Sequence, residues 1–276
     1  DDNKERSFAW VARTAKLIKQ LDPNHMVSTG SEGEMGCEGD IGLWRRIHAL
    51  PEIDYANIHI WPYNWRWISQ ENVGGDLTVA CEKTTEYIRR HAEIARELGK
   101  PLVIEEFGYP RDSFAFEPGS PTTARDAYYR HIFEQVIRSA AAGDIVAGCN
   151  FWGWGGAARP VHLSWQAGDD YCGDPAQEEQ GLNSVFDNDH TTLREITAAN
   201  RTLGLHAQAL TATPGNGTPA ALLRLLRETS ARNRLLFGQQ DFPFYGCDWA
   251  YRPGCCDVKA CCGDYPAVLG CDLGEI

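Results

Sequence analysis

The sequence predicts an α/β protein built on parallel strands, and three observations lead to this prediction. Up to about residue 203, segments with helical apolar spacing alternate with short apolar runs of strand length. Polar and aromatic motifs follow the carboxyl ends of these runs, and no GxGxxG or Walker pattern of a nucleotide-binding sheet occurs. A doubly wound sheet and a (β/α)8 TIM barrel both fit the alternation, and the motif positions favour the C-terminal half of a barrel.

The expected elements follow one another in strict alternation. Helices are expected where apolar side chains recur at helical spacing, over residues 3–21, 41–49, 79–99, 122–143 and 191–203, two of them ending on Gly99 and Gly143. Strands are expected over the apolar runs at residues 25–29, 53–60, 100–107 and 145–152. Four such units make half of an eight-stranded barrel.

The composition changes after this first domain, residues 1–203. Residues 204–218, "GLHAQALTATPGNGT", lose periodicity and are rich in Ala, Thr, Pro and Gly, which is typical of a linker. Residues 219–276 then show a helical segment at 219–229 and apolar runs at 234–241 and 265–273. We therefore expect the start of a second (β/α)8 barrel after the linker.

Charge and hydropathy exclude several classes of partner. The formal net charge of −12 argues against a nucleic acid or an anionic membrane surface and suits a neutral substrate. No apolar run approaches the length of a membrane span. The first residues, "DDNKERSFAW", resemble the middle of a domain rather than a signal peptide. Nothing in the sequence indicates an oligomeric state.

The ten cysteines give no clear metal or disulfide pattern. Four are scattered along the chain, and six fall between Cys247 and Cys271. That cluster contains no CxxC pair, which argues against a zinc site, and its spacing fixes no disulfide connectivity.

The segment "PLVIEEFGYPRD" carries the most informative carboxylates. Glu106 alternates in phase with Leu102 and Ile104, so Glu105 is expected on the other face, where one option is a pairing with a base from a flanking helix. A carboxylate on the inner face of a barrel can attack an anomeric carbon. His59, in "NIHIWPYNW", fits either a structural or a functional role. Tryptophans at strand ends can offer flat faces to a sugar ring or simply pack the loops.

Four motifs in order, "STGSEG", "NIHIWPYNW", "EEFGYPRD" and "GCNFWGWGG", resemble glycoside hydrolase family 5, and in particular its β-mannanase branch. The resemblance implies that Glu106, in E-F-G, is the nucleophile of a retaining endo-β-1,4-mannanase acting on mannan, glucomannan or galactomannan. His59 would hydrogen-bond near it, and Trp152 would form the floor beneath the sugar. Trp61, where the family more often has Tyr, and Trp154 are the other expected substrate-binding residues. The reaction needs no metal and no organic cofactor.

The resemblance also raises the question of the general acid. Retaining hydrolysis needs a second carboxylate, which in family 5 is the Glu of an N-E-P motif after strand four, and no N-E-P occurs in the 276 residues. We therefore expect a fragment that begins just after its own acid and is inactive alone. Glu32 and Glu34 are the nearest alternative acids, although they belong to another loop.

The segment beginning "LLFGQQDFPFYGCDWAY" resembles the N-terminal part of glycoside hydrolase family 26, with Gln239 where that family usually has His and with Cys at several altered positions. No catalytic residue is expected there. The two resemblances together imply that the chain is part of a tandem mannan-degrading enzyme with a polysaccharide substrate. Because polymeric mannan cannot cross a membrane, its expected location is extracellular, periplasmic or on the cell surface. The alternatives are a β-glucanase or xylanase of family 5, and a non-catalytic carbohydrate-binding module.

Overall fold

The computed structural model describes residues 2–209 and four short stretches beyond them, at 238–240, 245–246, 249–250 and 268–270. The chain divides into two compact units, Asp1–His206 and Ala207–Ile276, which are described separately.

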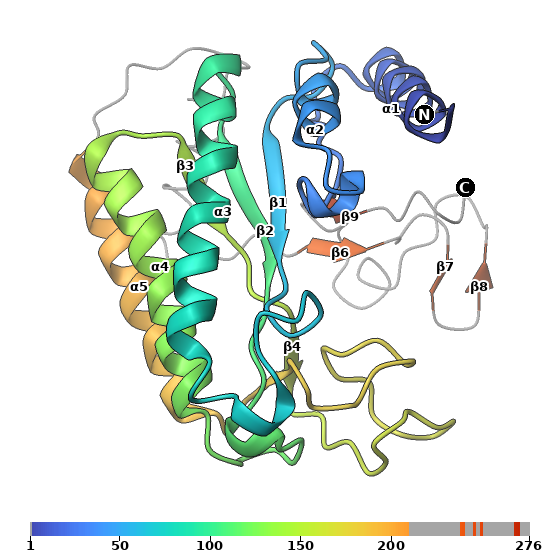
Figure 1. Cartoon of the computed structure of the whole chain (residues 1–276). Helices are drawn as coiled ribbons and strands as arrows, with labels where there is room; N and C mark the ends of the chain where they lie inside the picture. The colour runs from blue at the N-terminus through green and yellow to red at the C-terminus, as the bar shows by residue number, and fades with distance from the viewer. Residues whose placement is uncertain (1, 210–237, 241–244, 247–248, 251–267, 271–276) are drawn as a thin grey trace. The chain divides into compact units, whose positions relative to one another are not determined.

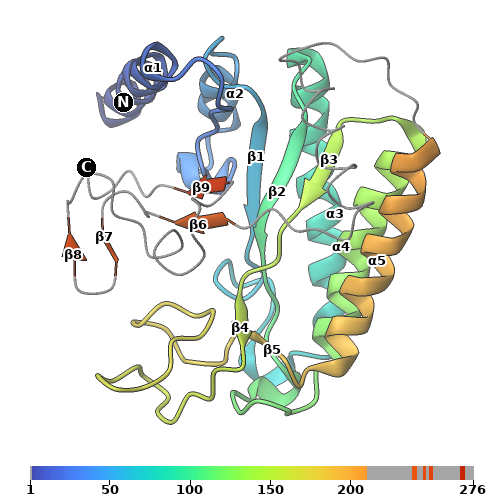
Figure 2. The same ribbon diagram turned by 180° about the vertical axis from the view of Figure 1, so that it is seen from behind.

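The first unit is built on a parallel three-stranded sheet. Strands β1 (Ala56–Ile60), β2 (Leu102–Phe107) and β3 (Val146–Cys149) lie in the order β1-β2-β3. Parallel neighbours need a crossover, and here the crossovers are the helices α3 (Leu77–Leu98) and α4 (Thr123–Ala142). These two helices and α5 (His190–Ala209) lie on one face of the sheet (Figures 1 and 2). The expected α/β fold is confirmed.

The helices begin and end at residues suited to those positions. Asp40 caps helix α2 (Ile41–His48), because its side chain accepts a hydrogen bond from the Leu43 N–H. Gly99 and Gly143 end α3 and α4 with left-handed φ angles of 67° and 64°, as expected. The other helix of the N-terminal part is α1 (Asp2–Leu21), and short 3-10 turns occupy Met35–Cys37, Gln70–Asn72 and Asp112–Phe114.

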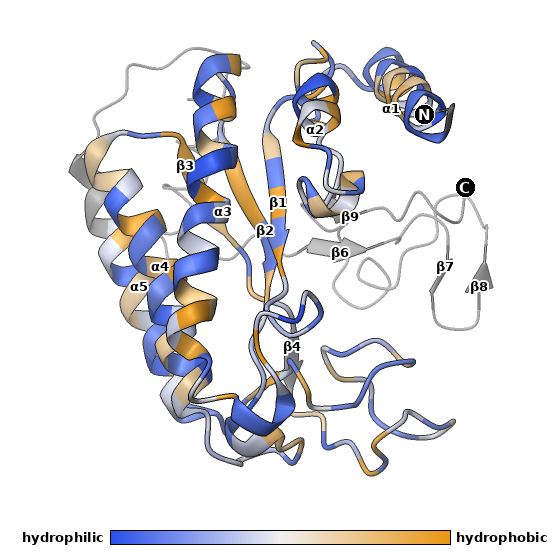
Figure 3. Cartoon of the chain, in the orientation of Figure 1, coloured by the Kyte–Doolittle hydropathy of each residue, from blue (hydrophilic) through white to orange (hydrophobic). Residues whose placement is uncertain are grey.

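The core lies between the sheet and its helices. Alternate residues of β1 and β2 are fully buried in one apolar cluster with side chains of α2, α3 and α4; in the strands these residues are Ala56, Ile58, Ile60, Leu102, Ile104 and Phe107. Apolar residues recur along the strands and on the sides of α3 and α4 in Figure 3. The opposite set of side chains, Asn57 and His59 of β1 and the preceding Tyr55, is polar. One face of the sheet therefore carries the core and the other carries hydrogen-bonding groups.

Two of the expected strands differ from the structure. Residues 25–29 form no strand, because Val27 is held by Asp54, whose side chain and backbone both bond to it, and not by a ladder with β1. The expected strand 145–152 is assigned only over Val146–Cys149, although the N–H groups of Asn150 and Trp152 still donate to β2 carbonyls, of Ile104 and Phe107. The expected linker also begins too early, since α5 continues to Ala209.

A second small parallel pair, β4 (Trp154–Gly156) and β5 (Val185–Phe186), was not expected from the sequence. The long loop between these strands, residues 157–184, follows β4 and lies at the end of the unit toward which β1 points (Figures 1 and 2). The strands of the first sheet therefore end at the same edge as this loop.

In the second unit, β6 (Gly238–Gln240) pairs in parallel with β9 (Val268–Gly270), and β7 (Tyr245–Gly246) pairs antiparallel with β8 (Trp249–Ala250). The expected runs 234–241 and 265–273 thus contain β6 and β9. The expected helix 219–229 and the six clustered cysteines lie outside the described residues. Among the helices that the structure describes, none is long and apolar enough to cross a membrane.

Candidate active site

A register shift between β1 and β2 places both adjacent glutamates on the polar face. Ile58 pairs with Ile104, whereas the next residue, His59, pairs with Glu106, so Glu105 is an extra residue in β2. The expected alternation of Glu106 with Leu102 and Ile104 is therefore wrong, because those two residues face the helices and the irregularity turns Glu106 away from them. Strand phase cannot distinguish the two carboxylates, since both reach the same histidine.

His59 lies between these two carboxylates. Its Nδ1 is 3.1 Å from Glu106 Oε2, and its Nε2 is 3.7 Å from Glu105 Oε2, a separation that makes the second contact a charge interaction and not a hydrogen bond. Burial by itself lowers the pKa of His59, but the contacts with Glu105 and Glu106 outweigh burial and raise the pKa to about 9. His59 is therefore a cation at neutral pH.

Glu105 has a different partner from the expected one. Its Oε1 accepts a 2.7 Å hydrogen bond from the Tyr55 hydroxyl, which comes from the residue just before β1. The second carboxylate of the pair is thus held by a strand neighbour and by His59, and not by a base from a flanking helix.

A cavity of about 200 Å³ lies beside Glu106. Its lining comes from the end of β2, from the loop before α2, from the loops that follow β1 and β3, and from the 157–184 loop. The residues are Glu32, Trp61, Asn64, Glu106, Trp152, Pro175 and Glu178. The backbone N–H of Trp152 donates to the Phe107 carbonyl at 2.8 Å, which fixes the backbone of this tryptophan next to the nucleophile candidate. The structure therefore brings together Glu106, Trp61 and Trp152, with His59 directly behind Glu106.

Trp154 does not join this group. It lies two residues beyond Trp152 in β4, it does not line the cavity, and 57% of its surface is exposed.

Residues 1–207, three quarters of the chain, match the family described as "GH family 5 beta-mannosidase-like". The chain belongs to glycoside hydrolase family 5. This family fits the geometry, since barrel enzymes carry their catalytic residues at the carboxyl ends of parallel strands and glycoside hydrolysis uses carboxylates.

Individual proteins of similar sequence or structure are named as mannosidases or mannanases. Mannan endo-1,4-beta-mannosidase 3 of Arabidopsis thaliana is 29% identical over 223 residues, which are 74% of this chain and 47% of that protein. A family 5 mannosidase from Rhizomucor miehei superimposes with a TM-score of 0.67 at 31% identity, over 74% of this chain and 49% of that one. An endo-beta-1,4-mannanase from Thermotoga petrophila shares the fold, with a TM-score of 0.51 at 24% identity, over 74% of this chain and 41% of that one. The chain spans about half the length of these proteins or less.

The 157–184 loop brings to the cavity residues that the sequence did not suggest, Pro175 and Glu178. Buried Asp174 accepts hydrogen bonds from the backbone N–H groups of Gly181 and Asn183, and the Gln180 side chain donates to the carbonyls of Pro175 and Glu178. These bonds hold the loop so that Glu178 reaches the cavity. Only a long-range arrangement brings Glu178 there, so no local motif could have revealed it.

The surroundings of Glu178 disfavour its charged form. Burial raises its pKa above the usual range, and the charges of Asp174, Glu179 and Glu106 raise it further. Glu32 also lines the cavity, whereas Glu34 is 9% exposed and forms an ion pair with Arg90 at 2.8 Å. Of the two alternative acids suggested by the sequence, only Glu32 is at the site.

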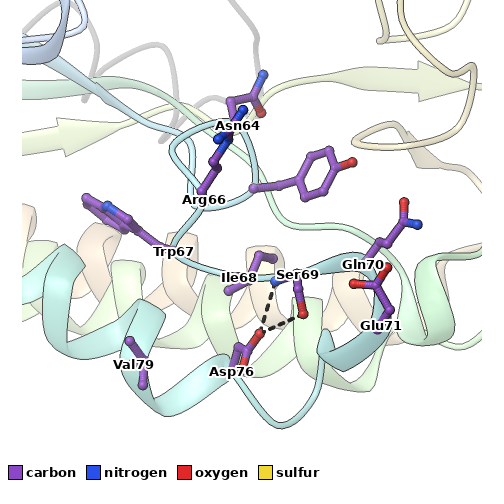
Figure 4. Close-up of a pocket in the computed structure, with 10 residues that line it drawn as sticks. Asn64, Arg66, Trp67, Ile68, Ser69, Gln70, Glu71, Asp76 and Val79 are labelled. Atoms are coloured by element: carbon purple, nitrogen blue, oxygen red, sulfur yellow. Dashed lines mark hydrogen bonds between the residues drawn. The ribbon is translucent and has the colours of Figure 1, made fainter.

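The loop after β1 also forms a second, larger hollow of about 610 Å³, which shares Asn64 with the first. Figure 4 shows Trp67 at one end of this hollow and Gln70 and Glu71 at the other. Asp76 fixes the loop between them by accepting hydrogen bonds from the backbone N–H and hydroxyl of Ser69. The two hollows are therefore neighbours on the loop that follows β1.

Neither a disulfide of the first unit nor a metal site is found among the described residues. The cysteines of the first unit, Cys37, Cys81, Cys149 and Cys172, are free thiols. Within the part of the chain that the structure describes, no group of three or more His, Cys, Asp and Glu residues is placed to hold a metal ion.

Proposed function

We propose that the complete protein is a retaining β-1,4-mannan hydrolase, an endo-mannanase, in which Glu106 is the nucleophile. The observation that carries this proposal is the position of Glu106, which lines a cavity between Trp61 and Trp152 and contacts a cationic His59. A non-catalytic sugar-binding module would have no use for a carboxylate and a charged histidine at this position.

The residues of the cavity fit the first chemical step. A Glu106 carboxylate oxygen would form a bond to the anomeric carbon while the bond to the leaving oxygen breaks, giving a covalent glycosyl–enzyme ester. The N–H of cationic His59 faces Glu106 and balances its charge before the attack. Trp61 and Trp152 supply apolar surface for the sugar ring. Water then cleaves the ester in the second step.

The second step and the leaving group need another carboxylate, which acts as acid and then as base. No N-E-P occurs in the sequence, and the chain spans about half the length of its relatives. We assign the acid/base to the other half of a complete family 5 barrel. Helix α1 supports such a partner half, because Trp10, Leu17 and Leu21 on one of its sides are 42%, 52% and 78% exposed.

The substrate proposal rests on the relatives. Both the Arabidopsis thaliana and the Thermotoga petrophila protein are named for cleavage within mannan, whereas the Rhizomucor miehei protein is named a mannosidase and a variant of it is described with mannosyl-fructose. The second hollow beside Asn64 favours a substrate longer than one or two sugars, and hence endo-cleavage.

Purified polysaccharides test this proposal in the complete protein. Linear mannan and glucomannan should yield mixed manno-oligosaccharides, far faster than cellulose or xylan is cut. Release of mannose alone from chain ends would replace endo-cleavage by exo-mannosidase action. Faster release of cello- or xylo-oligosaccharides would instead show a β-glucanase or xylanase.

Two further proposals concern the rest of the protein. The parallel pairing of β6 with β9 supports the start of a second α/β domain, because parallel strands need a long crossover, and its resemblance to family 26 suggests another mannanase. Mass spectrometry of the secreted and cellular fractions of the source organism would test the proposed location outside the cytoplasm, where polymeric mannan is found.

A further inference from the structure

We propose that Glu105 and Tyr55 form a positioning pair that holds His59 with one ring N–H directed at Glu106. This inference rests on the proposed function, because it concerns the same nucleophile. Neither Glu105 nor Tyr55 lines the cavity, so both would act through His59 and not on the sugar.

The contacts form one continuous chain across the two strands. The Tyr55 hydroxyl donates to Glu105 Oε1 at 2.7 Å, which leaves Oε2 of the same carboxylate facing His59 Nε2 at 3.7 Å. The opposite ring nitrogen, Nδ1, is 3.1 Å from Glu106. The extra residue in β2 makes this possible, because it directs two consecutive side chains toward one imidazole.

Burial restricts the alternatives open to these groups. The His59 side chain is 10% exposed and that of Glu105 is 18% exposed, so little water is available to replace either contact. Burial, and then the charge of Glu105 and its hydrogen bond, raise the pKa of Tyr55 well above its ordinary value, so its hydroxyl remains a donor.

The surrounding charges agree with a cationic His59. Glu105 and Glu106 are the carboxylates that contact it from β2, and Glu178 interacts with Glu106 from the 157–184 loop. On the α2 side, burial lowers the pKa of His48, which also interacts with Glu105, so His48 adds no competing positive charge. A second carboxylate thus favours protons on both nitrogens of His59.

The functional consequence concerns the N–H that faces the nucleophile. A neutral imidazole can carry its single proton on either nitrogen, and in one tautomer it would present a lone pair to Glu106. With Glu105 opposite, the doubly protonated ring always presents a donor. Glu105 therefore orients the group that prepares Glu106 for attack.

The test uses Glu105→Gln in the complete protein, with Tyr55→Phe as a second, milder variant. The His59 signals in ¹⁵N NMR, identified by their loss in His59→Gln, would be titrated from pH 5 to 10. We expect the pKa of His59 to fall by at least one unit in Glu105→Gln and by less in Tyr55→Phe. Glu97→Gln, which changes an exposed glutamate of α3, is the matched control and should leave the titration unchanged.

Kinetics then separate positioning from general structure. A dinitrophenyl mannoside needs no proton on its leaving group, so its rate of hydrolysis does not depend on the general acid. The rate on this substrate should therefore fall at the pH where His59 is deprotonated. In Glu105→Gln that loss should move to lower pH, with kcat reduced about ten- to a hundredfold because the nucleophile is misplaced. An unchanged His59 titration and an unchanged profile in both variants would overturn the proposal. A shifted titration in a protein that hydrolyses no glycoside would support the pair and reject the proposed function.

Discussion

His59 is the register partner of Glu106 in the parallel pair β1–β2, although strict counting from Ile58 and Ile104 would pair it with Glu105. This single extra residue brings two carboxylates to one imidazole. It also places Glu106 at the cavity, with Trp152 bound to the neighbouring Phe107 carbonyl. The catalytic proposals depend on this irregularity of the sheet.

Gly108 allows Trp61 to approach the end of β2. A Cβ atom at position 108 would lie 2.6 Å from Trp61 Cζ3 and 2.8 Å from Asn183 Oδ1, so Gly108→Ala must displace the tryptophan. We expect Gly108→Ala to lower kcat/KM about ten- to a hundredfold. Gly148→Ala in β3 is the control, because a Cβ there would meet no atom within 4 Å. Equal kinetics for both variants would refute the role of Gly108.

The two tryptophans of the "NFWGWGG" motif should differ in importance. Trp152→Ala removes an aromatic wall of the cavity, and we expect kcat/KM on mannotetraose to fall by about two orders of magnitude or more, since stacking and orientation are both lost. Trp154→Ala changes an exposed side chain outside the cavity and should change kcat/KM by less than about threefold. Comparable losses in the two variants would restore the sequence-based role of Trp154.

The stability of the protein should depend on the charge of His59. Its pKa is raised from 6.5 to about 9 on folding, so its contribution is complete below pH 6.5 and is lost as the pH rises through 9. At about 1.4 kcal/mol per pKa unit, the contribution is at most about 3.5 kcal/mol. Urea unfolding of the wild type and of His59→Gln between pH 6 and 10 measures it.

The difference in unfolding free energy between these two proteins should shrink steadily above pH 6.5. Because both share every other titrating group, subtraction isolates His59. Two curves that stay parallel from pH 6.5 to 9.5 would show that His59 is not held as a cation.

The 276 residues alone should not hydrolyse mannan. Without its acid, the reaction loses a factor of about 10²–10⁴, and the uncovered side of α1 should bind an apolar dye. Joining the chain to the N-terminal half of a family 5 barrel should reduce dye binding and restore hydrolysis. The same fusion with the N-E-P glutamate changed to Gln should restore only the folding. Robust hydrolysis by the chain alone would direct attention to Glu32 and Glu178 as acids.

Local sequence patterns identified most of the first unit. Helix ends were clear because Gly99 and Gly143 are natural stops, and the strands with continuous apolar runs were found. The strand predicted over residues 25–29 was wrong, because Val27 packs against Ile53 and Ala15 in a small apolar cluster and does not belong to a sheet. The short pair β4–β5 could not be predicted, since two- and three-residue strands leave no periodicity.

The site was predictable only where short motifs define it. Glu106, His59, Trp61 and Trp152 stand in such motifs, and the structure gathers them at one end of the sheet. Glu178 and the Tyr55–Glu105 contact depend on a loop fold and on a sheet irregularity, which spacing does not encode. The predicted phase of Glu106 with Leu102 and Ile104 was wrong for the same reason.

The identity of the nucleophile is tested most directly by trapping the glycosyl–enzyme intermediate. The complete protein would be treated with 2-deoxy-2-fluoromannosyl fluoride, and the labelled peptide sequenced by tandem mass spectrometry, which separates Glu105 from Glu106. The account predicts one label per protein, on Glu106, slower labelling in Glu105→Gln and none in Glu106→Gln. A label on Glu105, Glu32 or Glu178 would contradict it.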